Sequence, residues 1–239
     1  MKRTLALLAA LAGTPALASS FDINNLGALA QPDFHVLAQD MGAAFSWKAL
    51  EPADPLGITG FDIGLAVTGT SLQDSTTVQK AVSGGTVYNT LPVPTLRITK
   101  GLPFDLDLGI LYSKVPSSNV TFSGAELKWS ALSGNVALPA VSVRLAATAL
   151  SGVQQLTQRT QSLDVEVSKG FLFVKPYAGV GEVWSQATPS GVAGLAKESL
   201  TQSKVFVGVD CNLGLVNFVV EGDRTGSVST WGAKFGVRF

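Results

Sequence analysis

His35 is the only histidine of this 239-residue chain, so it is the first candidate for acid–base or nucleophilic chemistry. A nucleophile needs a base within hydrogen-bond reach, and the base needs a third group to orient it. Asp33 lies close to His35, but no feature of the sequence connects the pair to a particular serine. We therefore expect no catalytic residue and predict that the chain is not an enzyme.

Two pairs of acidic residues have a spacing that could hold a divalent cation. Asp105 and Asp107 alternate along one strand face, as do Asp164 and Glu166. Hard cations favour several such oxygen ligands. Lysines and arginines of neighbouring strands are the commoner partners of such carboxylates, so we predict no metal site. Cys211 is the single cysteine, which excludes an internal disulfide and a cysteine-rich metal centre, and no cofactor is expected.

The charge balance gives no support for a nucleic-acid partner. The chain has 17 basic and 17 acidic residues, so its formal net charge is zero. Only 14% of the residues are charged, and after the N-terminus the hydrophobic residues are dispersed in alternating runs.

β-Strands are the elements that would position the charged residues. Apolar and polar side chains alternate with a period of two. The pattern is clear in ten segments and ambiguous in residues 34–50, where we expect a strand mainly over 42–50. Residues 51–57 are expected to form a rigid turn. A closed membrane barrel is one fold that fits such alternation, and it would require an even number of strands, so ten to twelve strands are predicted. The ten clear segments are 61–67, 92–100, 103–115, 120–132, 139–150, 160–169, 171–184, 202–213, 215–222 and 230–239.

Charged residues within these segments lie on the face opposite the large aliphatic side chains. An Arg or Lys facing lipid at mid-membrane costs about 2–4 kcal/mol, which would explain this segregation. Eight acids and seven bases suit a network of ion pairs across a lumen. A water-soluble antiparallel sandwich would show the same alternation, so periodicity alone leaves both folds open. The predicted lumen-lining residues are Asp62, Arg97, Asp105, Asp107, Glu126, Lys128, Arg144, Asp164, Glu166, Lys175, Lys204, Asp210, Glu221, Lys234 and Arg238.

The N-terminus has the pattern of a secretory signal peptide. Lys2 and Arg3 precede a short apolar run, and an Ala-x-Ala site ends at Ala18. The apolar run is shorter than the roughly 20 residues of a spanning helix. We expect cleavage after Ala18, so that residues 19–239 form a single mature domain.

The last ten residues, 230–239, alternate strictly and end on an aromatic residue, Phe239. Together with the export signal, this pattern resembles the terminal strand of bacterial outer-membrane β-barrel proteins. The resemblance implies an all-β transmembrane barrel in the outer membrane of a Gram-negative bacterium. It also implies that Phe239 is an insertion signal for the outer-membrane insertion machinery, and that outer-membrane lipid surrounds the barrel.

Several aromatic residues near the ends of the predicted strands fit the interfacial girdles of such a barrel. Amphipathic rings favour the level of the lipid headgroups. The predicted girdle residues are Trp47, Tyr112, Trp129, Trp184 and Trp231.

The connections between strands alternate between short and long, as a membrane barrel requires. The long loops, which include 73–89 and 186–201, are expected on the external side. Residues 19–40 do not alternate and form an N-terminal lead, in which Ile23, Leu26 and Leu29 fit one face of a short helix that Pro32 would end. This helix could plug the barrel mouth or lie at the periplasmic rim.

The predicted number of strands limits the width of the lumen and therefore the possible functions. Eight strands give a filled barrel and sixteen an aqueous channel, so ten to twelve indicate a narrow, largely occluded lumen. The expected function is a small porin-like channel or carrier for small solutes. The alternative is a non-conducting structural or surface-interaction protein that acts through residues 73–89 and 186–201. No motif selects a substrate, and the oligomeric state stays open.

Overall fold

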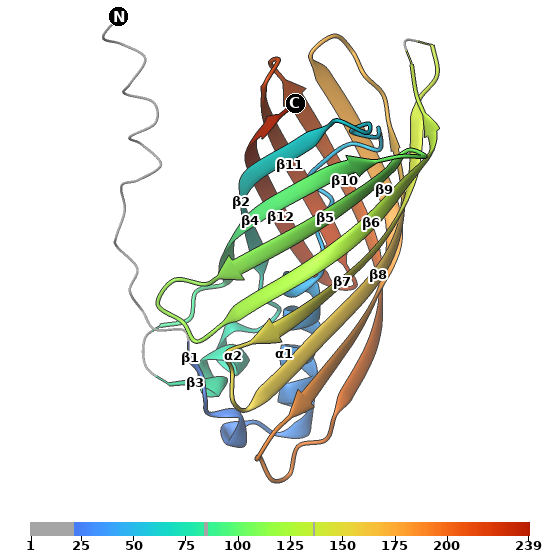
Figure 1. Cartoon of the computed structure of the whole chain (residues 1–239). Coiled ribbons are helices and arrows are strands. Elements are labelled where there is room, and N and C mark those ends of the chain that lie inside the picture. The colour runs from blue at the N-terminus through green and yellow to red at the C-terminus, as the bar shows by residue number, and fades with distance from the viewer. Residues whose placement is uncertain (1–21, 84–85, 136) are drawn as a thin grey trace, which may run out of the picture.

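The computed structural model describes residues 22–83, 86–135 and 137–239, so the predicted signal peptide lies outside the described residues. Ten antiparallel strands form one closed barrel (Figure 1). The predicted antiparallel barrel of ten to twelve strands is therefore confirmed. The barrel strands are β2 (Phe61–Ser71), β4 (Thr90–Leu102), β5 (Leu106–Lys114), β6 (Thr121–Ser133), β7 (Ala140–Ser151), β8 (Leu156–Ser168), β9 (Val174–Pro189), β10 (Glu198–Asn212), β11 (Val216–Thr225) and β12 (Val228–Arg238).

Pairing of β12 with β2 closes the barrel. The Phe61 amide donates to the Phe239 carbonyl at 2.6 Å, and the Phe239 amide donates to the Phe61 carbonyl at 3.0 Å. The two rings stack with their centroids 5.7 Å apart. The start of β2 and the end of β12 thus lie together at one end of the barrel, which we call the terminal rim.

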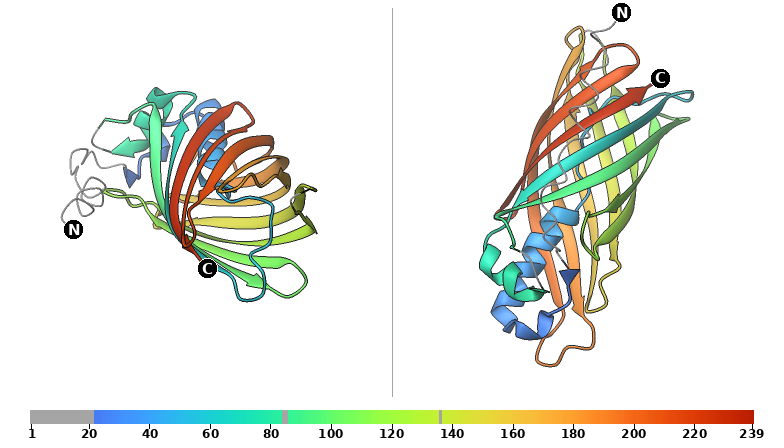
Figure 2. Two further views of the ribbon diagram at one scale, coloured as in Figure 1. Left: turned by 90° about the horizontal axis from the view of Figure 1, so that it is seen from above. Right: turned by 90° about the vertical axis from the view of Figure 1, so that its left-hand side faces the viewer.

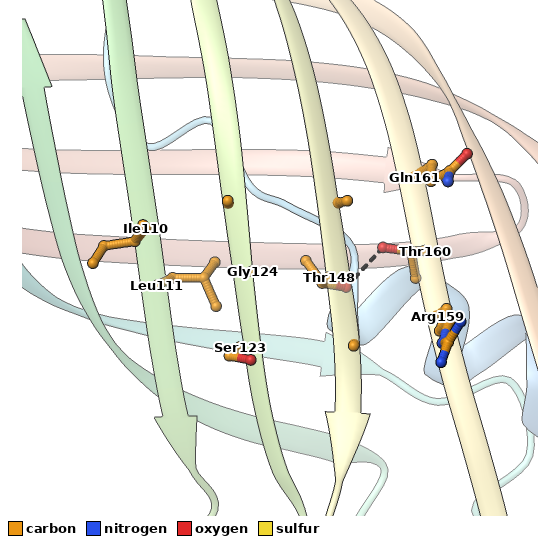
Figure 3. Close-up of a pocket in the computed structure, with 11 residues that line it drawn as sticks. Ile110, Leu111, Ser123, Gly124, Thr148, Arg159, Thr160 and Gln161 are labelled. Atoms are coloured by element: carbon orange, nitrogen blue, oxygen red, sulfur yellow. Dashed lines mark hydrogen bonds between the residues drawn. The ribbon is translucent and has the colours of Figure 1, made fainter.

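The two faces of the wall have opposite chemistry. Leu65, Val207 and Phe235 are more than half exposed on the outside, whereas Arg144 and Lys204 are buried within. An apolar outer surface around a charged interior is the arrangement of a transmembrane barrel and the reverse of a water-soluble sandwich, so the sandwich alternative is wrong. A groove crosses the outer face over β5–β8 (Figure 3).

Helix α1 (Gln31–Phe45) corrects two expectations about the N-terminal part of the chain. Pro32 lies in the first turn of this helix and does not end one, because a proline there removes no intrahelical hydrogen bond. The residues before Pro32 form only a 3₁₀ turn, η2 (Leu26–Ala28). The predicted strand 42–50 is also wrong, and its removal from the eleven alternating segments leaves the even number that the barrel has.

The non-barrel elements gather at the end opposite the terminal rim, which we call the helical end (Figures 1 and 2). There β1 (Asp22–Ile23) pairs with β3 (Val82–Ser83), and α2 (Ser75–Ala81) follows its N-cap residue Asp74. Buried apolar residues of α1, η2 and α2 share one hydrophobic cluster with the inner wall, among them Leu26, Phe34, Leu37 and Val78. No helix of the described ranges is both long and apolar enough to cross a membrane.

Gly208 should be essential for packing of the inner wall. A Cβ atom there would lie 2.3 Å from Cζ of the buried Tyr177, so the ring would have to shift. We expect Gly208→Ala to lower the free energy of unfolding by about 1–3 kcal/mol, the usual cost of overpacking. Thermal unfolding in detergent micelles measures this change.

Gly222→Ala is the matched control, because Gly222 lies on the adjacent strand β11 and a Cβ there meets no atom within 4 Å. Equal unfolding temperatures for the two variants would contradict the packing assigned to Tyr177.

Candidate functional site

Residues 46–60, which we call the lumenal segment, run through the barrel from the end of α1 to the start of β2 at the terminal rim. Trp47, Ala49, Leu50 and Ala53 of this segment are at most 1% exposed. The segment has no helix or strand, so apart from the Gly60 amide, which donates to the Gly57 carbonyl at 2.9 Å, its backbone groups find their partners elsewhere. Buried backbone polar groups need partners, and within a membrane such irregular chain is tolerated only where it is buried in protein.

Cationic side chains of the wall supply donors to the carbonyl groups of the lumenal segment. Arg97 of β4 donates to the Lys48 carbonyl at 2.8 Å and to the Ala49 carbonyl at 3.1 Å. Lys204 of β10 donates to the Trp47 carbonyl at 2.9 Å. Two strands on different sides of the barrel thus hold adjacent residues of the segment.

Acceptors of the wall bind the amide groups of the same segment. Glu221 of β11 accepts from the Leu50 amide at 2.6 Å and from the Tyr177 hydroxyl at 2.8 Å. Asp107 of β5 accepts from the Leu56 amide at 3.1 Å. The wall side chains therefore provide the pairing that neighbouring strands provide elsewhere.

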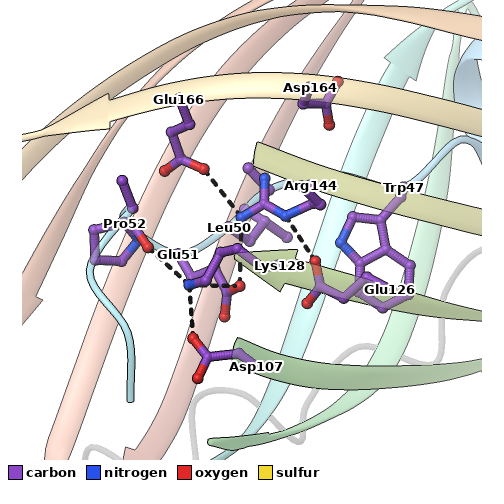
Figure 4. A network of polar contacts seen from close by, with 12 residues as sticks. Trp47, Leu50, Glu51, Pro52, Asp107, Glu126, Lys128, Arg144, Asp164 and Glu166 are labelled. Carbon is purple, nitrogen blue, oxygen red and sulfur yellow. Dashed lines mark hydrogen bonds and ion pairs between the residues drawn. The ribbon is translucent and has the colours of Figure 1, made fainter. Parts of the chain in front are cut away.

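Glu51 of the lumenal segment lies in an ion cluster at the centre of the lumen (Figure 4). Its Oε1 lies 3.4 Å from Arg144 Nη2. Arg144 also approaches Glu126 Oε2 at 2.7 Å through Nε and Glu166 Oε2 at 3.0 Å through Nη2. One guanidinium on β7 thus holds the segment together with carboxylates of β6 and β8.

Lys128 of β6 is the second cation of this cluster. Its Nζ lies 3.2 Å from Glu51 Oε1 and 3.2 Å from Asp107 Oδ2, and it donates to the Pro52 carbonyl at 3.0 Å. Arg144 and Lys128 are both at most 1% exposed. Because a buried charge is costly without close partners, these contacts fix the position of Glu51. We call Glu51, Asp107, Glu126, Lys128, Arg144 and Glu166 the central cluster.

Further ion pairs brace the wall above and below the central cluster. Near the terminal rim, Asp62 pairs with Lys234 at 3.1 Å and with Arg238 at 2.6 Å. Lys204 pairs with Asp164 at 2.9 Å. Toward the helical end, Lys48 of the lumenal segment pairs with Asp223 at 3.0 Å.

Most of the predicted lumen residues lie on the inner face of the wall. Arg238 and Lys175 are partly exposed there, and Lys175 pairs with Asp54 of the lumenal segment at 3.1 Å. The predicted residues that are buried inside are Asp62, Arg97, Asp107, Glu126, Lys128, Arg144, Asp164, Glu166, Lys204, Asp210, Glu221 and Lys234.

Asp105 is an exception, and its assignment to the lumen is wrong. It is exposed in the turn between β4 and β5, where Phe104 and Asp105 have φ values of +67° and +57°. Aspartate tolerates this left-handed conformation better than most residues. The strand therefore begins at Leu106, and the Asp105 carboxylate accepts from the Ser133 hydroxyl at 2.9 Å.

Trp47 is the exception among the predicted girdle residues. It lies in the lumen, and the guanidinium carbon of Arg97 is 4.6 Å from its ring centroid. Tyr112, Trp129, Trp184 and Trp231 are exposed on the outer surface.

Sequence reasoning missed Lys48, Glu51 and Asp54, the three charged residues of the lumenal segment that pair with the wall. The pattern that could have shown them is a run of apolar residues, prolines and isolated charges, placed before the first clear strand.

His35 lies at the helical end, and both of its ring nitrogens have partners. Nδ1 is 2.9 Å from Glu198 Oε2 of β10, and Nε2 is 3.0 Å from Gln39 Nε2. Gln31 joins the same contact by accepting from the Ala196 amide at 2.7 Å. These contacts attach α1 to the β9–β10 hairpin. Within the described ranges, no group of three or more His, Cys, Asp or Glu residues could hold a metal ion.

Asp40 links α1 to the start of the loop after β2. Its carboxylate accepts from the Gln73 amide at 3.2 Å and from Gln73 Nε2 at 3.0 Å. Burial raises the pKa of Asp40 to about 6, and the hydrogen bonds from Gln73 lower it only in part. Gln73 also accepts from the Ser227 hydroxyl at 2.5 Å, so α1 is tied to the β11–β12 turn as well.

No family model matches the chain, and no curated protein matches it. Among solved structures, OprG of Pseudomonas aeruginosa aligns over 79% of this chain and 99% of its own, with 12% identity and a TM-score of 0.35. Ail of Yersinia pestis, in complex with the heparin analogue sucrose octasulfate, aligns over 75% and 97%, with 14% identity and a TM-score of 0.31. A loop-deletion mutant of OmpT of Vibrio cholerae aligns over 62% of this chain but only 54% of its own, with 14% identity and a TM-score of 0.32. Likenesses this distant carry no argument about function.

Arg144 should be the cation on which the central cluster depends most. Arg144→Ala leaves Glu126 and Glu166 without their ion-pair partner and takes one of two cations from Glu51. Removing one partner of a buried pair costs about 3–5 kcal/mol, and we expect a loss of this order in the free energy of unfolding. Denaturant unfolding in detergent micelles, followed by circular dichroism, measures it.

Lys80→Ala is the control, because the pair between Lys80 and Asp33 at 2.9 Å is largely exposed on the helical end. Its loss should change the free energy of unfolding by less than about 1 kcal/mol. A similar effect of both substitutions would show that Arg144 does not hold a buried cluster.

Proposed function

We propose that the chain is an outer-membrane β-barrel protein that does not conduct and that acts at the cell surface through its helical end. The lumenal segment is the observation that carries this proposal. Residues 46–60 occupy the barrel axis and contact inner side chains of nine strands, β4, β5, β6, β7, β8, β9, β10, β11 and β12. A conducting pore needs a continuous aqueous path along this axis.

The space beside the lumenal segment supports a closed lumen. A cavity bounded by Lys48 and Leu50 of the segment and by Thr95 and Arg97 of the wall has a volume of about 10 Å³. A single water molecule needs roughly 10–15 Å³, so a hydrated ion does not fit there.

The outer-membrane location is supported by the apolar outer wall and by the sequence features of export. In this proposal the terminal rim is periplasmic, as the resemblance to outer-membrane barrels implies, and the helical end is external. The insertion machinery would recognise the terminal strand that ends at Phe239.

The helical end is built as one connected surface, which supports a role in interaction. α1 is attached to the β9–β10 hairpin through Gln31 and to the loop after β2 through Gln73. Asn119 of the β5–β6 connection donates its side-chain amide to the Ile23 carbonyl at 3.1 Å, which joins β1 to this surface. Chain from the N-terminal lead and three connections between strands is thus held in a fixed arrangement.

A porin-like channel or carrier is the alternative function. Solute passage along the axis would require release of the lumenal segment, and release would break the contacts of Glu51 and Lys48 with the wall. The charge-lined wall would then become accessible to solutes.

Conductance in planar bilayers tests the proposal. The wild-type protein should show no stepwise openings, because the lumenal segment fills the axis. Glu51→Ala removes the carboxylate that pairs with Lys128 and Arg144, so this variant should show brief openings. Lys80→Ala, on the surface of the helical end, should stay closed. Regular open-channel steps of the wild-type protein would overturn the proposal and favour the channel.

A further inference from the structure

A groove of about 570 Å³ lies on the outer face of the barrel, over β5, β6, β7 and β8 (Figure 3). Its floor consists of small outward-facing side chains of β6 and β7, where larger side chains would fill the space. The floor residues are Ser123, Ala125, Ala147 and Ala149.

The strand register shows how the groove is bounded. Along one row of paired residues, Ile110 of β5 and Gln161 of β8 stand on either side of Ala125 and Ala147. In the next row toward the helical end, Arg159 of β8 follows Ala149. The groove therefore has an apolar wall on β5 and a polar wall on β8.

The rows above and below place the groove at the edge of the apolar band. The row on the side of the terminal rim consists of exposed leucines, Leu108, Leu127, Leu145 and Leu163. The row on the side of the helical end contains Lys114 and Ser151. Because an outward-facing arginine is costly at mid-membrane and much less so near the interface, Arg159 marks the level of the lipid headgroups.

The side chains of Arg159 and Gln161 differ from the charged side chains inside the barrel, because within the described residues neither makes an ion pair or a hydrogen bond to another group. Both are exposed. Glu182, an exposed acid of the neighbouring strand β9, is paired in register with Leu163, whereas Arg159 is paired with Gln186. The positive charge of Arg159 is therefore not balanced by the protein.

We propose that this groove binds one membrane lipid with a net-negative phosphate headgroup. An acyl chain lies on the alanine floor and continues over the leucine row, and the phosphate lies against the Arg159 guanidinium. Guanidinium groups match phosphate oxygens in a two-pronged geometry. Gln161, one row deeper, donates its side-chain amide to an ester oxygen of the same lipid.

This inference requires that the barrel lie in a bilayer, as proposed above, but it does not require a closed lumen. Open-channel steps in the bilayer experiment would overturn the closed lumen and leave the lipid site intact. Failure of the lipid test below would leave the closed lumen intact.

Native mass spectrometry of the delipidated protein tests the site, with phosphatidylglycerol and phosphatidylcholine added as probes. We expect one phosphatidylglycerol to be retained at least 5-fold more strongly than phosphatidylcholine. Arg159→Gln should remove this preference. Arg224→Gln should keep it, because Arg224 is also outward-facing but lies on β11, away from the groove.

Ala147→Phe tests the contribution of the groove independently of the charge of Arg159, because a phenyl ring fills the floor of the groove and leaves Arg159 in place. It should weaken retention of both lipids at least 5-fold. Because Arg159 and Ala147 face outward, unchanged unfolding temperatures should show that both variants are folded. Equal retention of the two lipids, or wild-type retention by either groove variant, would overturn the proposal.

Discussion

The structure depends on hydrogen bonds between the inner wall of the barrel and the backbone of an extended segment that lies inside it. Residues 46–60 bring amide and carbonyl groups into an interior where no adjacent strand can pair with them. Long cationic side chains of the wall, such as Arg97 and Lys204, donate hydrogen bonds to these carbonyl groups. Carboxylates of the wall, such as Glu221, accept hydrogen bonds from the amide groups. The inner charges are therefore ligands of the chain itself as well as partners of one another. This dual use explains why so many charges can be buried at a cost that the fold tolerates.

Barrel size explains why such a segment is needed. Eight strands enclose an interior that side chains alone can fill, and larger barrels leave space. Ten strands fall just beyond this limit, so the lumenal segment fills the remaining volume and Glu51 neutralises two cations of the wall. The composition of the outer surface has a different cause, since this surface contacts lipid. It is apolar over most of its height, and unpaired polar groups such as Arg159 stand where that band ends.

Much of the barrel could be predicted from the sequence, because alternation of side chains is a direct consequence of strand geometry. It identified the ten barrel strands and the inward face of residues such as Arg144 and Asp164. Alternation gave wrong predictions for the part of the chain that lies inside the barrel. In residues 34–45, Phe34, Leu37, Met41 and Phe45 have helical spacing, but the run of small residues after Met41 fits either period. Trp47 packs within the lumen, so its position near the end of a predicted strand led to the wrong assignment to the interfacial girdle. Contacts of Glu51 with two different strands could not be predicted, since they depend on how the barrel closes.

Accessibility of a cysteine on the barrel axis tests the filled lumen most directly. Ala53 is fully buried in the lumenal segment, and Ala193 is exposed in the β9–β10 loop. In a Cys211→Ser background, Ala53→Cys and Ala193→Cys would be exposed separately to a small water-soluble methanethiosulfonate reagent in micelles. A filled lumen predicts rapid modification at 193 and protection at 53 until the protein is unfolded. Modification at 53 as rapid as at 193 in the folded protein would show a water-filled axis and contradict this account.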